Sequence, residues 1–194
     1  MNYPGGIKIK NISKEINYKN RGMTLENDIN KTNEYYKEIE KAYIYKKPTP
    51  IKIVKVDYPS REKAIIKEAY FTIPSTTDYN GLYKGKYIDF EAKETISKTS
   101  FSLSNIHKHQ IKHLDNIDKN GGISFIIVRF TTLNKTYFVL AKDFIEYVNN
   151  VTRKSIPIDF FEKKAYILND TYRPPIDYLK VVDYIIGGNN GKEN

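Results

Sequence analysis

The stretch from 78 to 95 reads DYNGLYKGKYIDFEAKET, and its alternating second half predicts a β-strand with two unlike faces. In the run IDFEAK one face is apolar, while the other carries Asp89, Glu91 and Lys93. A further acid, Asp78, precedes a glycine-marked bend that can bring it alongside Glu91. Charges on one face of a strand are usually just solvated. Here the apolar opposite face, and the apolar segments that follow, favour a covered sheet with a functional site.

Outward from this stretch, the sequence predicts one α/β domain with a mixed sheet. Leu25, Ile29, Tyr36, Ile39 and Tyr43 have helical spacing, and the prolines of KKPTP (46–50) end that helix. Further helices are expected from Ser104 to about Asn120, over KDFIEYVNN (142–150), and at the C-terminal end of the fold. Strands are expected at 51–57, 64–71, 86–94, 123–130 and 136–141, with the first arm of the bend as another.

Composition limits the class of protein. The chain has 194 residues, of which 40% are hydrophobic, which suits one domain with a genuine core. It has no cysteine, no apolar run of the ~20 residues that a membrane span needs, and no signal-peptide pattern at its N-terminus. A soluble cytoplasmic protein is therefore expected. We predict a basic N-terminal arm at 1–20, a folded domain at 21–186 and a frayed tail at 187–194.

The net charge of +9 favours a polyanionic partner, although a Lys- and Asn-rich coding bias explains part of it. More specific is the pairing of Asp78 with Glu91, because two carboxylates brought together form a hard oxygen site suited to Mg²⁺. Such a metal can bind a phosphate and activate a water molecule. Lys93, on the same strand face as Glu91, can neutralise the charge of the reacting phosphate. These three residues together predict phosphodiester hydrolysis.

The flanking motifs make the prediction more specific. In this order, the chain contains NRGMTLENDIN (20–30), KKPTPIKIVKV (46–56), STTDYNGLYKGKYIDFEAKET (75–95), KTSFSL (98–103), HQIKH (109–113) and RKSI (153–156). Together they resemble the RecU-type Holliday junction resolvases of Gram-positive bacteria. The resemblance runs from about Arg21 to Tyr184, which is nearly the whole chain.

The resemblance implies a restriction-endonuclease-like fold, a stalk near 57–75, a homodimer, and cutting of four-way junctions in DNA recombination and repair. It implies dependence on Mg²⁺, with Mn²⁺ as the alternative ion, and contact with the recombinase RecA. It also assigns Asp78 and Glu91 as metal carboxylates and Lys93 as the stabiliser of the transition state. Thr76 and Gln110 match positions that the family assigns to its metal site.

Gln110 also stands out without the family, because it lies inside the apolar helix stripe that contains Ile106 and Leu114. A polar side chain on a buried face needs a partner, which is either a backbone group or the metal site, and the neighbouring acids favour the metal site. Asp89 is left out of the predicted ligand set as a residue of the rim. Glu26 is either a first-turn acid that favours the helix dipole or a further carboxylate of the site.

The basic residues predicted to bind DNA phosphates gather in the first third of the chain. They are Arg21, Lys46, Lys47, Lys52, Lys55, Arg61, Lys63 and Lys67. Two other functions remain open from the sequence. One is a non-catalytic basic binder of branched DNA, and the other is an endonuclease of restriction type that cuts duplex DNA.

Overall fold

The structure, a computed structural model, describes residues 23–71 and 76–188. The predicted N-terminal arm, Arg21 and most of the predicted tail lie outside these residues. The main sheet is six-stranded and mixed, because β5 and β7 run parallel while the other neighbours are antiparallel. In spatial order it contains β1 (Tyr43–Lys46), β4 (Tyr79–Tyr83), β5 (Lys86–Thr95), β7 (Ile123–Phe130), β8 (Lys135–Leu140) and β10 (Tyr166–Leu168).

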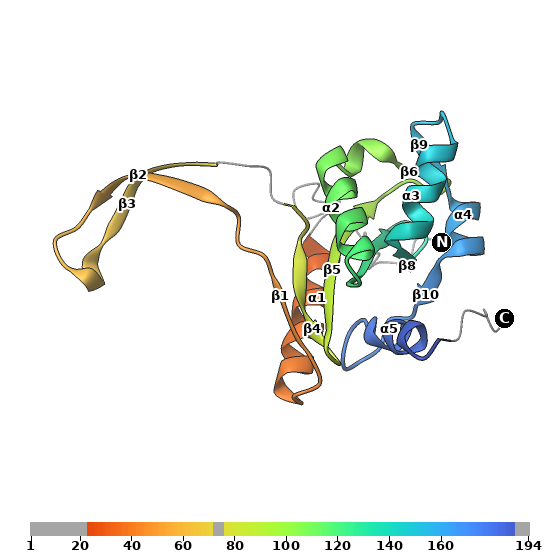
Figure 1. The fold of residues 1–194 in the computed structure, drawn as a ribbon, viewed down its shortest axis with the longest axis horizontal. Helices are drawn as coiled ribbons and strands as arrows, with labels where there is room; N and C mark the ends of the chain where they lie inside the picture. The colour runs from red at the N-terminus through yellow and green to blue at the C-terminus, as the bar shows by residue number, and fades with distance from the viewer. Residues whose placement is uncertain (1–22, 72–75, 189–194) are drawn as a thin grey trace, which may run out of the picture.

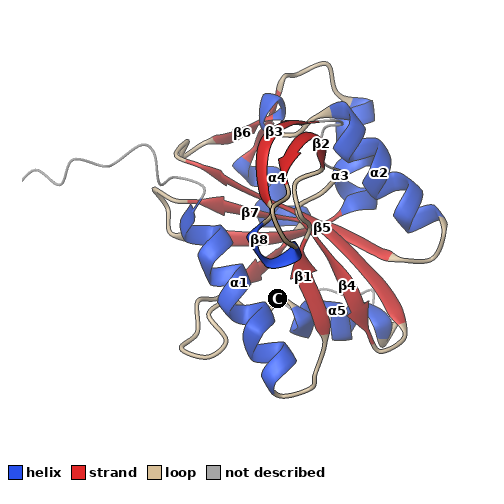
Figure 2. Cartoon of the chain, turned by 90° about the vertical axis from the view of Figure 1, so that its left-hand side faces the viewer, coloured by secondary structure: helices blue, strands red, loops and turns tan. Residues whose placement is uncertain are grey.

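Helices cover both faces of this sheet, so it separates two hydrophobic cores. On one face, α1 (Met23–Glu38) and α5 (Leu179–Ile186) bury residues such as Ile29, Leu179 and Phe90. On the other lie α2 (Lys108–Lys119), α3 (Ala141–Asn150) and α4 (Ile158–Lys164). Figure 2 shows α1 and α2 on opposite sides of the strands. The predicted mixed α/β architecture with flanking helices is confirmed.

The centre of the sheet is rigid because its strands are buried on both faces. All eight residues of β7, ISFIIVRF, are buried, as expected for an apolar strand between two helical layers. On the α1 side, Tyr79, Phe90, Phe125 and Phe138 stack ring on ring across four strands, with successive centroids 4.8, 4.6 and 4.1 Å apart. This aromatic row fixes the position of β5, the strand that carries Glu91.

The hairpin of β2 (Ile51–Asp57) and β3 (Ile65–Phe71) forms a two-stranded sheet of its own and projects from the body (Figure 1). Both strands were predicted, but every residue in them is exposed, and neither joins the main sheet. The hairpin is the stalk that the family resemblance implied. It begins at Ile51 rather than at 57, while residues 72–75 lie outside the described part of the chain.

The first helix is shorter than predicted. It ends at Glu38, and Tyr43 lies in β1, paired with Leu82, rather than on the helix. A turn stops the helix, because Glu40 adopts a left-handed conformation with φ of 54° and the amides of Lys41 and Ala42 both donate to the Tyr36 carbonyl. The helical spacing of Ile39 and Tyr43 was therefore a coincidence.

The structure adds short elements that the sequence patterns did not show. A 3₁₀ turn, η3 (Leu103–Asn105), precedes α2, which begins at Lys108 with His107 at its N-cap instead of at Ser104. β6 (Ser100–Ser102) pairs with β9 (Ser155–Pro157), and a second 3₁₀ turn, η2 (Arg61–Lys63), closes the hairpin. No helix within residues 23–71 and 76–188 has the length and apolarity to cross a membrane.

Candidate active site

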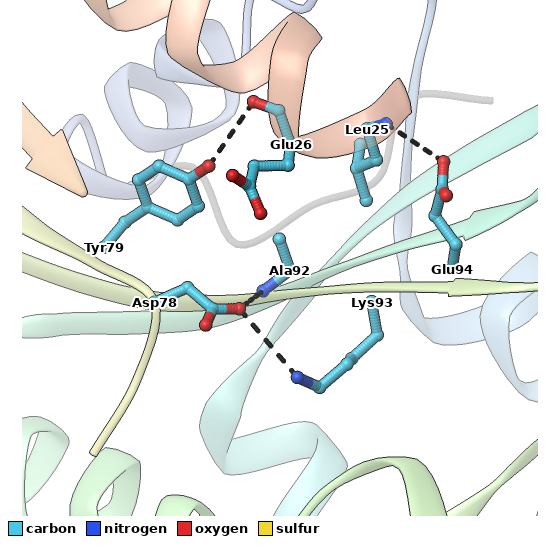
Figure 3. A pocket seen from close by; sticks show the side chains of 7 residues that line it. All are labelled: Leu25, Glu26, Asp78, Tyr79, Ala92, Lys93 and Glu94. Carbon is cyan, nitrogen blue, oxygen red and sulfur yellow. Dashed lines mark hydrogen bonds and ion pairs between the residues drawn. The ribbon is translucent and has the colours of Figure 1, made fainter. Parts of the chain in front are cut away.

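The site lies in a notch in the main sheet. β4 pairs with β5 only as far as Tyr79 opposite Phe90, whereas β5 continues to Thr95 beside β7. The edge of β5 beyond Phe90 is therefore open on the β4 side, and Asp78 lies where β4 leaves it. A pocket of about 310 Å³ occupies this region (Figure 3). Its lining residues are Leu25, Glu26, Asp78, Tyr79, Ala92, Lys93 and Glu94.

Asp78 is held against β5 by both its backbone and its side chain. Its amide donates to Glu91 Oε2 at 3.1 Å, and its carboxylate accepts from the Ala92 amide at 3.3 Å. Lys93 Nζ lies 3.9 Å from the same carboxylate oxygen. The bend thus does what the sequence analysis expected of it, since it brings Asp78 alongside Glu91 from a position thirteen residues earlier in the chain.

Glu91 has no exposed side-chain surface and is surrounded by hydrogen-bond donors. Gln110 Nε2 donates to Oε1 at 2.7 Å, and the Lys93 ammonium pairs with the same oxygen. Burial, followed by the neighbouring charge of Asp78, raises the pKa of Glu91 to about 7, although Lys93 opposes the shift. A carboxyl group with this pKa releases its proton readily when a cation binds beside it at neutral pH.

Gln110 lies in the first turn of α2 and is buried, as its place in the apolar stripe predicts. Its amide nitrogen donates to Glu91, while its oxygen accepts from the His107 amide at 3.0 Å. The cap of α2 therefore orients the side chain that orients Glu91. Within this structure Gln110 contacts the predicted metal carboxylate directly, and a direct bond to the metal stays a prediction.

Thr76 is exposed and lies outside the lining of the notch. Its hydroxyl accepts from Lys47 Nζ at 3.2 Å, so it belongs to a neighbouring cluster around Asp89. Its assignment to the metal site stays a prediction.

Two acids approach the notch from the α1 side. Glu26 lines the pocket and pairs with Lys46 at 2.5 Å, which places it beside the predicted site rather than only at a helix end. Glu94 lines it too, accepts from the Leu25 amide at 3.0 Å, and has its pKa raised by burial. Glu94 was missed because it lies on the apolar face of the alternating strand, which sequence reasoning assigned to the core.

Asp89 is fully buried and does not line the notch, so it is not the rim residue that the sequence predicted. Its omission from the ligand set stays a prediction. It forms an ion pair with Lys47 Nζ at 2.7 Å, accepts from the Thr77 hydroxyl, and lies 3.1 Å from His113 Nε2. Tyr87 donates to it at 3.2 Å. This cluster was not foreseen, since nothing in the local sequence brings Lys47 to Asp89.

The predicted DNA-binding residues fall into two groups. Lys46 and Lys47 belong to the body, where each is paired with an acid. The others within the described chain are exposed on the hairpin, where Lys67 Nζ lies 3.4 Å from an oxygen of the Asp57 carboxylate. They are Lys52, Lys55, Arg61, Lys63 and Lys67. Arg21 is outside the described residues.

The donor set fits a hard divalent cation. Asp78 lines the notch, the buried Glu91 lies behind it with Lys93 Nζ beside both carboxylates, and Mg²⁺ commonly uses one or two carboxylates while keeping several waters. Residues 23–71 and 76–188 contain no group of three or more His, Cys, Asp or Glu side chains arranged to enclose a metal. The notch therefore suits an ion whose remaining ligands are water and substrate oxygens.

Known proteins resemble this chain over nearly its whole length. The family Recombination protein U (RecU) matches residues 20–184. The Holliday junction resolvase RecU of Geobacillus sp. (strain WCH70) is 53% identical over 193 residues, covering 94% of this chain and 96% of that protein. The corresponding protein of Pediococcus pentosaceus is 51% identical, with 95% and 97% covered.

Among solved structures, the Holliday junction resolvase Hjc of Archaeoglobus fulgidus has a TM-score of 0.43 at 11% identity, covering 74% of this chain and 93% of that one. The family match and the sequence identities to RecU relatives span nearly the whole chain. On those two findings, the chain belongs to the RecU family.

Proposed function

We propose that this protein is a Holliday junction resolvase, a crossover junction endodeoxyribonuclease, that depends on Mg²⁺ and separates the junction by two symmetric nicks. The observation that carries the proposal is the convergence of Asp78, Glu91 and Lys93 at the open edge of β5 in a member of the RecU family. Its relatives over nearly the whole chain are named Holliday junction resolvases.

In the proposed mechanism, Asp78 and Glu91 would hold the ion. Mg²⁺, or Mn²⁺, would supply Lewis-acid chemistry and a water of lowered pKa when bound there. The Lys93 ammonium lies beside both carboxylates, from which it can reach the charge that develops on the phosphate. Gln110 donates to the Glu91 carboxylate and so fixes its orientation. Glu26 is a further carboxylate at the mouth of the pocket.

The hairpin is proposed to grip the DNA. Its Lys and Arg side chains are exposed, and contacts to phosphates position a protein on DNA without reading its sequence. Two nicks on opposed strands need two notches, which a homodimer with twofold symmetry would supply. Contact with RecA and action in the cytoplasm complete the proposal and derive from the family resemblance and from the cysteine-free sequence.

The experiment compares a labelled four-way junction with a linear duplex of the same sequence, in Mg²⁺ and in EDTA. We expect paired symmetric nicks on the junction alone, lost in EDTA and in Asp78→Asn, while the variant still binds the junction. The control is Glu146→Gln, which removes an exposed acid of α3 away from the notch and should cut like the parent.

Two outcomes separate the alternatives. Equal cutting of the linear duplex would show an endonuclease of restriction type. Binding of the junction that survives chelation, with no cutting under any condition, would show a non-catalytic binder of branched DNA. Normal cutting by Asp78→Asn would refute the assignment of the notch.

A further inference from the structure

The base of the hairpin is joined to the catalytic strand by a polar cluster, centred on a buried acid, that the proposed mechanism does not use. The cluster consists of Lys47, Thr76, Thr77, Asp89 and His113. At its centre Asp89 has no exposed surface, and a buried carboxylate persists only when charged and polar partners compensate its lost hydration. Lys47, Thr77 and His113 contact it from three separate parts of the fold, and Tyr87 of β5 donates to it as well.

Lys47 binds both ends of the hairpin. It follows β1 directly and leads into the hairpin, so it marks the point where the chain leaves the body. Its ammonium donates to the hydroxyls of Thr76 at 3.2 Å and Thr77 at 2.6 Å, where the chain returns. Its amide donates to the Asp78 carbonyl at 2.8 Å. Lys47 therefore links the outgoing chain to the incoming chain and to the backbone of Asp78, the residue whose carboxylate is a proposed metal ligand.

The same cluster is built onto the strand and the helix that form the notch. Asp89 lies two residues before Glu91 on the same face of β5, so the two carboxylates occupy neighbouring positions along one rigid strand. His113 lies three residues after Gln110 on α2, and each contacts one of these carboxylates. A shift of the hairpin base would therefore move Asp78 relative to Glu91.

We propose that Lys47 is a positioning residue, an inference that rests on the proposed function. Through its ion pair with Asp89, Lys47 holds the hairpin at a fixed orientation to the notch. DNA bound by the hairpin then presents its phosphate to the metal site. The hairpin needs such a link to hold its orientation, because none of its strand residues is buried against the body. A misplacement of about 1 Å at a reacting phosphate can cost about 100-fold in rate.

The first test measures geometry without DNA or metal. The chain has no cysteine, so spin labels can be placed at Lys63→Cys near the hairpin tip and Lys142→Cys on α3, both exposed. The distance distribution between the labels should be narrow in the parent and clearly broader in Lys47→Met. An unchanged distribution would overturn the proposal, whether or not the protein proves to be a nuclease.

The second test separates binding from cutting. With enzyme in excess over a four-way junction, Lys47→Met should cut about 100-fold more slowly while its Kd for the junction in EDTA changes less than about threefold. The matched control is Lys86→Met, an exposed lysine at the other end of β5, which should cut at the parental rate. A loss of binding equal to the loss of rate would instead make Lys47 a DNA contact.

A structural defect is excluded by a second variant. Lys47→Met leaves the buried Asp89 without its cation, whereas Lys47→Met combined with Asp89→Asn removes the buried charge as well. The double variant should regain thermal stability but remain slow and keep the broad label distribution. If its cutting rate recovers together with its Tm, the cluster serves folding alone and the proposal fails.

Discussion

The hairpin and the central strand β7 are built from similar residues in opposite surroundings. β7 is ISFIIVRF and entirely buried, while β2 is IKIVKVD and entirely exposed. β2 carries a lysine in its second and fifth positions, so no face of it is purely apolar. β-Branched residues thus favour a strand in both places. β7 is core because helices cover both of its faces, whereas β2 is surface because it carries lysines and no helix covers it.

The body and the hairpin are therefore suited to different roles. The body stabilises itself through two cores and a stacked aromatic row, so it can hold a buried acid such as Glu91 whose pKa is raised. The hairpin buries nothing, and an isolated two-stranded sheet is marginal in water. Chemistry therefore belongs to the body, while contact with a large ligand belongs to the hairpin. The following predictions test this division.

The largest effect is expected in the body, from Glu91→Gln. Losing a metal carboxylate should lower the rate of junction cutting by about 10³-fold, because metal stabilisation of the transition state is worth several kcal/mol. Junction binding in EDTA should be retained, since the hairpin is intact. Single-turnover cleavage and binding titrations measure both quantities. A variant that loses binding in proportion would show that notch and hairpin are not separate.

The second effect concerns the hairpin. Replacing residues 51–71 with Gly-Ser-Gly should weaken junction binding by about 100-fold near 0.1 M salt, because several phosphate contacts are lost. The Tm should change by less than about 2 °C, since none of the replaced strand residues packs in a core. The control keeps the hairpin and changes only Lys52, Lys55 and Lys63 to Gln, which should weaken binding and its salt dependence.

The same division explains what the sequence could predict. Alternation along 86–94 identified β5 and its charged face, and the bend correctly placed Asp78 beside Glu91. Gln110 was recognised because a polar residue inside an apolar stripe requires a partner, and it has both of the predicted kinds, the His107 amide of the backbone and Glu91. These successes rest on local periodicity, which remains visible because strand and helix geometry repeat at fixed intervals.

The features that escaped prediction depend on tertiary contacts. Tyr43 continued a helical spacing, but the left-handed turn at Glu40 carries no strong local signal, since glutamate rarely adopts it. The strands of the hairpin could not be assigned to a separate sheet, because alternation does not identify a partner strand. The pairing of Lys47 with Asp89 joins residues 42 positions apart, and His113, which also contacts Asp89, lies a further 24 positions along the chain.

A smaller effect follows from the raised pKa of Glu91. In the folded protein this pKa is about 7, against about 4.5 for an ordinary glutamate, so the folded state binds the proton more tightly. The free energy of unfolding in EDTA should therefore fall by about 2 kcal/mol as the pH rises from 5 to 7. Glu91→Gln should lack this component and be the more stable protein at pH 8. Denaturant titrations at several pH values measure the difference, and parallel curves for the two proteins would contradict it.

The smallest effect is expected from Ile53→Ala in the hairpin, with Ile126→Ala in β7 as its buried counterpart. Ile126→Ala in β7 removes a fully buried side chain and should cost about 3 kcal/mol of unfolding free energy. Ile53→Ala in the hairpin removes one that is 48% exposed and should cost less than about 0.5 kcal/mol. Both are measured by urea titration at two protein concentrations. A large cost for Ile53→Ala that appears only at the higher concentration would mean that the hairpin packs against a second protomer. The apolar residues of β2 would then form an interface as well as a DNA grip.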